Sequence, residues 1–281
     1  MTSHTNDLPL YIDSDNALGS PFGDIDDGFA LAALIKSGKS IEALSTVFGN
    51  SFEPLIYRNT KVLAGICGYS GPVLRGASTW WSRETESSRY LAELKRPVRA
   101  LALGPMTNFA AALKNGRKLD EQITELIFIG TNYSMHLPAL RFIDFNQWKD
   151  PKATRAVFDS KIPLTCIPCD VARKLRVSKT ALDNIPGQLG DHLKRNSARW
   201  FCRARLMKGL SSVPIWDLVA AIYALAPELF EVRETTAELG RMGQAFFGSQ
   251  GGRPLKVVID FDPSTVWNQF IHLVTQVTLS D

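Results

Sequence analysis

The sequence predicts an α/β fold: a single-domain, mostly parallel, doubly wound (Rossmann-like) sheet with helices on both faces. Short apolar runs alternate with amphipathic helical segments at least five times, which is typical of parallel strands joined by crossover helices. A length of 281 residues suits one large α/β unit, and a hydrophobic content of 45% is enough for its core. No internal repeat or linker-like segment divides the chain. We therefore expect residues 1–281 to form one domain.

The strands and helices can be placed in order from the spacing of apolar residues. Apolar runs bounded by glycine, proline or asparagine predict strands at residues 8–12, 41–48, 71–76, 98–103, 125–129, 163–167, 231–238 and 255–261. Helical spacing, together with signals such as Asp150-Pro151, predicts helices at residues 27–36, 53–69, 108–115, 150–159, 190–208, 216–226 and 264–275.

Composition excludes several classes of protein. The net charge of +4 is too mild to indicate nucleic-acid binding, and the basic clusters at residues 173–176 and 203–205 are expected to be solvated faces. No run approaches the roughly 20 apolar residues of a membrane span, and residues 1–7 do not resemble a signal peptide. The four cysteines show no disulfide framework. These features predict a cytoplasmic protein with no membrane or nucleic-acid partner.

The loop after the first strand is unusually acidic. Within fifteen residues it holds five carboxylates, namely Asp13, Asp15, Asp24, Asp26 and Asp27. In an open α/β sheet, ligands bind at the carboxyl ends of the strands, and crowded carboxylates repel one another unless a cation or protons neutralise them. Hard oxygen ligands suit calcium or magnesium. The loop therefore predicts a hard-cation site at the end of the first strand.

Further polar residues follow other strands or open helices. They are Asn50, Asn108, Asp144 and Asn146 in loops, and Asp217 at a helix start. Asn50, Asn108 or Asp217 alone can equally be a helix cap. Because several lie at one end of the predicted sheet, we expect them to converge with the acidic loop.

The motifs carrying these residues resemble the nucleoside hydrolases, the inosine–uridine-preferring group and its purine-specific relatives. The family's D-x-D-x-x-x-D-D pattern is represented by Asp13-Ser-Asp15 and by Asp26-Asp27. Its other four motifs also occur here, in the family's order, as T-V-F-G-N at 46–50, G-P-M-T-N at 104–108, D-F-N-Q-W-K-D-P at 144–151 and Trp216-Asp217. The resemblance extends over nearly the whole chain.

The resemblance implies a metal-dependent enzyme that hydrolyses the N-glycosidic bond of ribonucleosides to free base and ribose. Ca²⁺ would be held by Asp15, Asp27, Asp217 and the backbone carbonyl of Thr107. Asp15 would also take a proton from water, and Asp13 would hold Asp15 in place.

The resemblance also implies how the substrate is bound. The ribose hydroxyls would be held by Asp26, Asn50, Asp144 and Asn146. Where many members have a histidine that protonates the leaving base, this chain has Trp216, as in the purine-specific branch. Stacking on Trp216, with Trp80 or Trp81 on the other side of the base, would favour a purine and a role in purine salvage. Members of the family also suggest a homodimer or homotetramer.

The chain departs from the family pattern at two further places. Residues 16–23 are inserted between the two halves of the acidic motif, where they would either loop out, cover the pocket or disturb the metal geometry. Asp144 replaces a glutamate, and the segment before it, 136–143, is also altered.

Three other functions were weighed. A haloacid-dehalogenase-like phosphatase would use Asp13 and Asp15, but Ala17 breaks that motif and Asp217 is left unexplained. An EF-hand beginning at Asp13 would need glycine at Leu18 and glutamate at Asp24. A non-catalytic nucleoside- or ribose-binding protein of the same fold stays open, with the insertion as its support.

Overall fold

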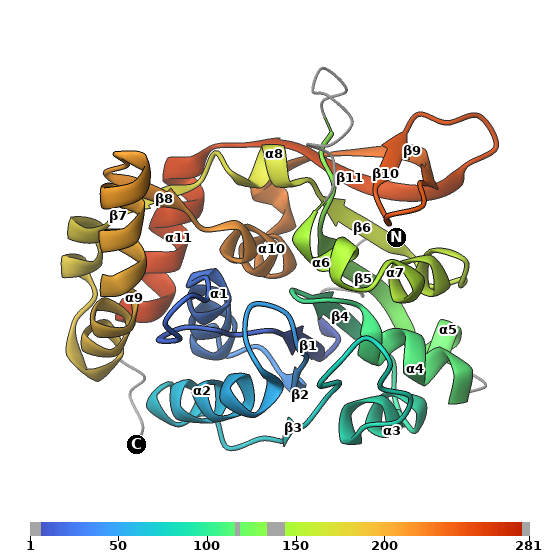
Figure 1. Cartoon of the computed structure of the whole chain (residues 1–281), viewed down its shortest axis with the longest axis horizontal. Helices are drawn as coiled ribbons and strands as arrows, with labels where there is room; N and C mark the ends of the chain where they lie inside the picture. Colours follow the sequence, from blue (N-terminus) through green and yellow to red (C-terminus); the bar gives the residue numbers. More distant parts are fainter. Residues whose placement is uncertain (1–6, 116–118, 134–143, 277–281) are drawn as a thin grey trace.

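The structure, a computed structural model, describes residues 7–115, 119–133 and 144–276. The altered segment 136–143, including His136, lies outside the described residues. Within the described ranges, nine strands form one sheet in the order β10-β9-β11-β6-β5-β4-β1-β2-β3 (Figure 1). Their bounds are β1 (Leu10–Ser14), β2 (Ile41–Thr46), β3 (Val73–Leu74), β4 (Val98–Ala102), β5 (Ile123–Ile129), β6 (Leu164–Ile167), β9 (Phe230–Leu239), β10 (Ala245–Phe247) and β11 (Arg253–Phe261).

Strands β1 to β6 run parallel, with β11 parallel to β6. Strands β9 and β10 extend the β11 edge in antiparallel pairing. The strand order reverses between β1 and β4, because the chain first adds β2 and β3 on one side and then β4 to β6 on the other. Ligands bind in open α/β sheets at such a switch point, outside the carboxyl ends of the strands.

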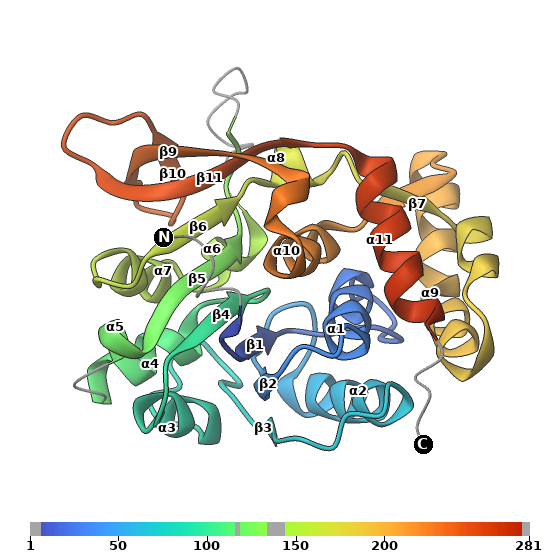
Figure 2. The ribbon, with the colours of Figure 1, turned by 180° about the vertical axis from the view of Figure 1, so that it is seen from behind.

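Helices cover both faces of the sheet, as Figures 1 and 2 show from opposite sides. The helices are α1 (Asp26–Lys36), α2 (Glu53–Ile66), α3 (Glu86–Ala92), α4 (Thr107–Asn115), α5 (Leu119–Gln122), α6 (Phe145–Lys149), α7 (Pro151–Phe158), α8 (Cys169–Ala172), α9 (Gly187–Lys208), α10 (Trp216–Leu225) and α11 (Pro263–Thr275), with short 3-10 turns at Lys179–Asn184 and Pro227–Leu229. One hydrophobic cluster contains residues of α1, α10 and α11, and a second contains residues of α3, α4 and α7.

The central strands are apolar on both sides, which explains their continuous hydrophobic runs. In β1, Leu10 and Ile12 belong to the first cluster and Tyr11 to the second. In β5, Ile127 and Phe128 divide in the same way. The predicted α/β class and doubly wound arrangement are therefore confirmed.

Some elements differ from the sequence-based expectation. The strand predicted at 71–76 shortens to β3, and helix α3 and strand β10 were not predicted. A separate two-stranded sheet also forms, from β7 (Arg176–Ser178) and β8 (Ser212–Pro214). These strands have only three residues each, too few to give a periodic signal. Among the described residues, no helix has the length and apolar content to cross a bilayer.

Candidate active site

Three buried carboxylates meet where two helices begin. Oxygen atoms of Asp26, Asp27 and Asp217 all lie within 4.8 Å of one another. Asp26 and Asp27 form the first turn of α1, and Asp217 lies in the first turn of α10. Both helix N-termini therefore direct their positive dipole ends toward this acidic cluster, which offsets part of the repulsion.

Asp15 joins the cluster from the end of β1. Its Oδ2 accepts a hydrogen bond of 2.6 Å from the backbone N–H of Asn50. Two glycines leave the space it occupies: a Cβ on Gly49 would lie 1.9 Å from Asp15 Oδ2, and one on Gly104 would lie 3.1 Å from Asp15 Cβ. The glycines of the second and third motifs are thus explained by the close approach of the backbone to this carboxylate.

Asp13 belongs to a buried hydrogen-bond network beneath the cluster. Its Oδ1 accepts hydrogen bonds from Ser45 Oγ at 2.7 Å and from Asn108 Nδ2 at 2.9 Å. Asn108 also donates to the carbonyl of Thr46, and its own Oδ1 accepts from the N–H of Ala77. These bonds fix the end of β1 against its neighbours, and with it the backbone that carries Asp15.

The electrostatics of the cluster suit a bound cation. Burial, followed by the charges of neighbouring carboxylates, raises the pKa of Asp15, Asp26 and Asp217 well above the ordinary value. Asp15 Oδ1, Asp26 Oδ1 and Asp27 Oδ2 are buried and have no hydrogen-bond partner among the described residues, a costly state unless another group neutralises them. Carboxylate oxygens so arranged fit a hard divalent cation.

The inserted segment at residues 16–23 packs against the protein body. Leu18 is buried in the first hydrophobic cluster and lies where a Cβ on Gly28 would approach to 2.6 Å. Gly19, with φ of +89°, lies against the side chain of Asn196 in α9. Phe22 alone is a highly exposed large hydrophobic residue here, at 81%. The insertion leaves Asp15 beside Asp27, which also accepts a hydrogen bond of 2.7 Å from Ser14 Oγ.

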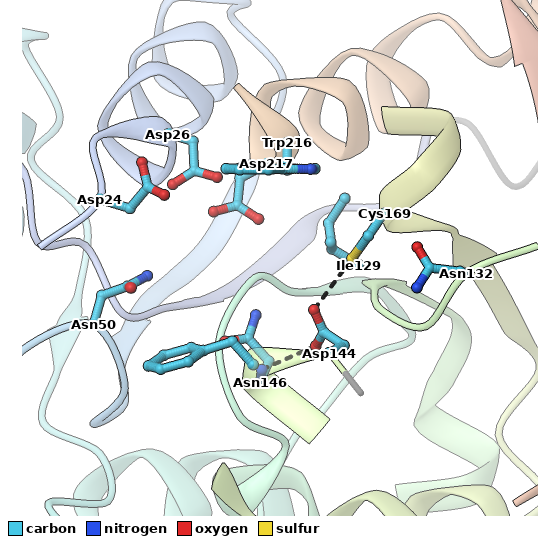
Figure 3. A pocket seen from close by; sticks show the side chains of 11 residues that line it. Asp24, Asp26, Asn50, Ile129, Asn132, Asp144, Asn146, Cys169, Trp216 and Asp217 are labelled. Carbon is cyan, nitrogen blue, oxygen red and sulfur yellow. Dashed lines mark hydrogen bonds between the residues drawn. The ribbon is translucent and has the colours of Figure 1, made fainter. Parts of the chain in front are cut away.

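A cavity of about 420 Å³ opens beside the cluster. In Figure 3, Asp26, Trp216 and Asp217 lie on one side of it, and Asp144 and Asn146 lie on the facing side. Six predicted site residues line this cavity: Asp26, Asn50, Asp144, Asn146, Trp216 and Asp217. Five further residues line the cavity, and the motifs predicted a binding role for none of them: Asp24, Ile129, Asn132, Phe145 and Cys169.

Asp144 and Asn146 are positioned by the start of α6. Asp144 caps the helix, since its Oδ1 accepts from the N–H groups of Asn146 and Gln147, and its Oδ2 accepts from Cys169 Sγ at 3.1 Å. Asn146 Nδ2 donates to the carbonyl of Leu103 at 2.6 Å, whereas its Oδ1 has no partner within residues 7–115, 119–133 and 144–276. The amide oxygen therefore remains an acceptor for a ligand hydroxyl at the cavity.

The two adjacent tryptophans do not line the cavity. Trp80 and Trp81 are 53% and 63% exposed and pack edge to face with ring centroids 5.0 Å apart. Lys152 Nζ of α7 lies 5.9 Å from the ring centroid of Trp80. The second aromatic ring of the cavity is instead Phe145, which is 43% exposed. The predicted motif contained this residue, but a phenylalanine beside a capping aspartate gave no signal for a binding role.

Thr107 lies at the start of α4, buried close to the same strand ends. Its hydroxyl donates to Asp150 Oδ2 at 2.8 Å, while Asp150 Oδ1 caps α7 by accepting from the N–H of Ala153. The last aspartate of the fourth motif thus holds two helix starts together. The predicted role of the Thr107 carbonyl as a metal ligand stays a prediction.

Comparison with known proteins agrees with these motifs. The model of the inosine–uridine preferring nucleoside hydrolase family matches residues 10–268. Uridine nucleosidase 1 of Arabidopsis thaliana is 24% identical over 256 residues, covering 78% of this chain and 76% of the relative. The pyrimidine-specific ribonucleoside hydrolase RihA of Shewanella baltica is 24% identical over 241 residues, covering 83% of this chain and 74% of the relative.

A solved structure shares the fold. That of an inosine–guanosine nucleoside hydrolase superposes with a TM-score of 0.80 at 18% identity, covering 96% of this chain and 99% of that one. The family model spans most of the chain and all five motifs lie within it, from Asp13 to Asp217. The chain therefore belongs to the inosine–uridine preferring nucleoside hydrolase family of enzymes, as its motifs predicted.

Proposed function

We propose that this chain hydrolyses the N-glycosidic bond of ribonucleosides at the cavity beside the acidic cluster, with Ca²⁺ as its cofactor. The observation that carries the proposal is the set of buried carboxylate oxygens that have no partner in the described ranges, beside a cavity that Trp216 also lines. Asp15, Asp27, Asp217 and the carbonyl of Thr107 would hold the ion. Asp26 lies close enough to Asp27 and Asp217 to share in this role. A bound divalent cation supplies activation of water by lowering its pKa.

The protein's own groups then account for proton transfer. Asp15 Oδ2 accepts a hydrogen bond from the N–H of Asn50, whereas Oδ1 has no partner in the part of the chain that the structure describes. We therefore assign Oδ1 as the atom that accepts the proton of the attacking water. Asp13, held by Ser45 and Asn108, keeps this carboxylate in position.

The ribose would lie between the cluster and α6. Asp26, Asn50, Asp144 and Asn146 line the cavity and offer acceptors and donors for its hydroxyls. As the bond to the base breaks, positive charge develops on the sugar, and fixed carboxylates near it stabilise that charge. Here the carboxylates are preorganised by helix starts and strand ends.

For the leaving base we propose stacking on Trp216 and a preference for purines. The indole N–H is a donor without useful acidity, so Trp216 would act through its ring, which attracts an electron-poor base. Phe145 is the other aromatic ring on the cavity. Trp80 and Trp81 would contact the base only after a movement of their loop. Two relatives are named for uridine or pyrimidine nucleosides, so the preference needs a direct test. Trp216→Ala is expected to lower kcat/KM for inosine at least tenfold and for uridine less; faster uridine than inosine turnover by the parent protein would contradict the preference.

The main test is ribose release with and without metal. We expect turnover of inosine that disappears with a calcium chelator, returns with added Ca²⁺, and is lost in Asp15→Ala. Asp191→Ala, an exposed aspartate of α9, is the matched control and should keep full turnover. Normal turnover by Asp15→Ala would refute the mechanism.

The assay also separates the alternatives. A non-catalytic nucleoside-binding protein would bind inosine without releasing ribose. Its one support was the insertion, which packs on α1 and α9. A phosphatase using Asp13 and Asp15 would release phosphate from a phosphate ester, and the family match gives it no support.

We further propose that the chain works in the cytoplasm, in purine salvage, as a homodimer or homotetramer. Free cysteines fit a reducing compartment. The exposed pair Trp80 and Trp81 offers apolar surface for self-association. Light scattering after gel filtration would test the assembly, and a monomer at all concentrations would refute it.

A further inference from the structure

A second cavity adjoins the first across Trp216. Its volume is about 340 Å³, and Trp216 lines both cavities. It lies between the C-terminal half of α9 and the strands β7 and β8. Its other lining residues are Arg173, Arg176, Trp200, Arg203, Ala204, Met207, Lys208, Leu210, Val213 and Pro214.

This second cavity is lined by four cationic side chains and no carboxylate. None of Arg173, Arg176, Arg203 or Lys208 takes part in an ion pair within the described part of the chain. The surrounding segment, residues 171–214, contains ten Lys or Arg and two Asp, a net charge of +8 in a chain of net +4. Four of these ten cations line the cavity. The sequence predicted that the basic clusters at 173–176 and 203–205 are solvated faces. Arg173, Arg176 and Arg203 of these clusters instead line a cavity.

The walls of the cavity strengthen these charges. Apolar side chains of Trp200, Met207 and Val213 form part of the lining, and they exclude water near the cations. The Arg203 guanidinium lies 5.9 Å from the Trp200 ring centroid, and Arg176 Nε donates to Ser212 Oγ at 3.1 Å. Two of the four cations are therefore held by neighbours that leave their charge unneutralised.

The position of this cavity fixes which part of a substrate would reach it. The residues proposed to bind ribose, such as Asp144 and Asn146, line the first cavity only. Trp216, the proposed stacking surface for the base, belongs to both. The charge of Lys208 also acts on Asp24, which lines the first cavity. A group that projects from the base past Trp216 would enter the cationic cavity.

We propose that this cavity binds an anionic substituent carried by the leaving base, so that the enzyme accepts nucleosides whose base bears a carboxylate-containing side chain. The proposal rests on the nucleoside hydrolase activity proposed above. A volume of about 340 Å³ is roughly ten times that of one water molecule in the liquid. It therefore accommodates a short chain with one or two carboxylates, which guanidinium groups bind by charge-assisted hydrogen bonds.

A matched set of substrates tests this. The anionic probe is N6-(1,2-dicarboxyethyl)adenosine, its neutral counterpart of similar length is the dimethyl ester, and adenosine lacks the side chain. We expect kcat/KM for the diacid to exceed that for the diester by on the order of tenfold, the effect of one strong charge-assisted contact. The ratio should shrink in high salt, because mobile ions screen partly exposed charges.

Variants of the cavity identify the contacts. Arg203→Glu and Arg173→Glu should each bring the ratio of diacid to diester turnover to one or below. Arg199→Glu changes the same charge on α9 but does not line the cavity, and it should leave the ratio as in the parent protein. Direct titration into Asp15→Ala protein measures binding without turnover. The diacid should bind this protein more tightly than the diester.

The outcomes separate the two proposals. If adenosine, inosine and uridine are all left unhydrolysed, the proposed function fails. If they are hydrolysed but the diacid is no better than the diester, the anion-binding inference fails alone. Adenosine 5′-monophosphate carries its anion on the ribose. If Arg203→Glu lowers the turnover of this nucleotide and not that of the diacid, the assignment of the cavity to the base is overturned.

Discussion

Replacing Asp217 by asparagine should have opposite effects on stability with and without metal. Asp217 is buried, and its carboxylate oxygens lie within 4.8 Å of those of Asp26 and Asp27. The Asp217→Asn change keeps the size of the side chain and removes one charge. In the presence of a chelator the charge that is lost is a repelling one, whereas in the presence of Ca²⁺ it belongs to a ligand.

The size of the effect follows from Coulomb's law. Two unit charges 4.8 Å apart repel by about 3.5 kcal/mol at an effective dielectric constant of 20. Protonation relieves part of this, since burial and the neighbouring charges raise the pKa of Asp217 and Asp26. We therefore expect Asp217→Asn to stabilise the metal-free protein by about 1–3 kcal/mol. Ca²⁺ at 100 times its Kd should stabilise the parent protein by about 2.7 kcal/mol. It should stabilise the variant by much less.

Thermal unfolding at pH 7, in chelator and in millimolar Ca²⁺, measures both effects. Each kcal/mol corresponds to about 2–4 °C in Tm for a domain approaching this size. Asp191→Asn on the surface of α9 is the control, and its calcium-induced shift should equal that of the parent. Equal loss of Tm for Asp217→Asn in both buffers would refute a cation-binding role and leave Asp217 with a purely structural role in the first turn of α10.

Further variants test the geometry around Asp15. Gly49→Ala would place a methyl group 1.9 Å from Asp15 Oδ2, so we expect at least a hundredfold loss of kcat together with weaker calcium binding; Gly65→Ala in α2, where a Cβ meets nothing within 4 Å, should keep full activity and gain about 0.5–1 kcal/mol of stability. Asn108→Ala removes a donor to Asp13 and leaves buried groups unpaired, which should cost about 1–3 kcal/mol in chemical denaturation; no loss of stability would contradict a structural role for this network.

The convergence of the site residues could be predicted from the sequence, because parallel strands place their carboxyl ends at the same edge of the sheet. Motifs ending β1, β2 and β4, and the Trp216-Asp217 start of α10, meet at one cavity or in the buried layer beneath it. The ladder of parallel strands and the helices on both faces were predictable from the alternation of apolar runs alone. These predictions depend on the topology of the sheet, and the periodicity of apolar residues is enough to predict that topology.

Side-chain direction was not predictable in the same way. Trp80 and Trp81 lie in a loop whose path depends on long-range contacts, such as the hydrogen bond from Ala77 to Asn108. Phe145 reaches the cavity because Asp144 caps the short helix α6 and turns the next residue toward it. Asp24, which belongs to neither half of the acidic motif, lines the cavity. A single sequence contains the cap, but not the direction in which the capped helix points.

The insertion shows why a long change in a motif can leave its chemistry intact. The two halves of the acidic motif are held separately: Asp15 by the end of β1 and the N–H of Asn50, and Asp27 by the first turn of α1. Lengthening the connection costs little chain entropy, and burying Leu18 against Gly28 compensates for it with apolar contacts. The cluster therefore depends on where β1 ends and α1 begins, and not on the number of residues between them.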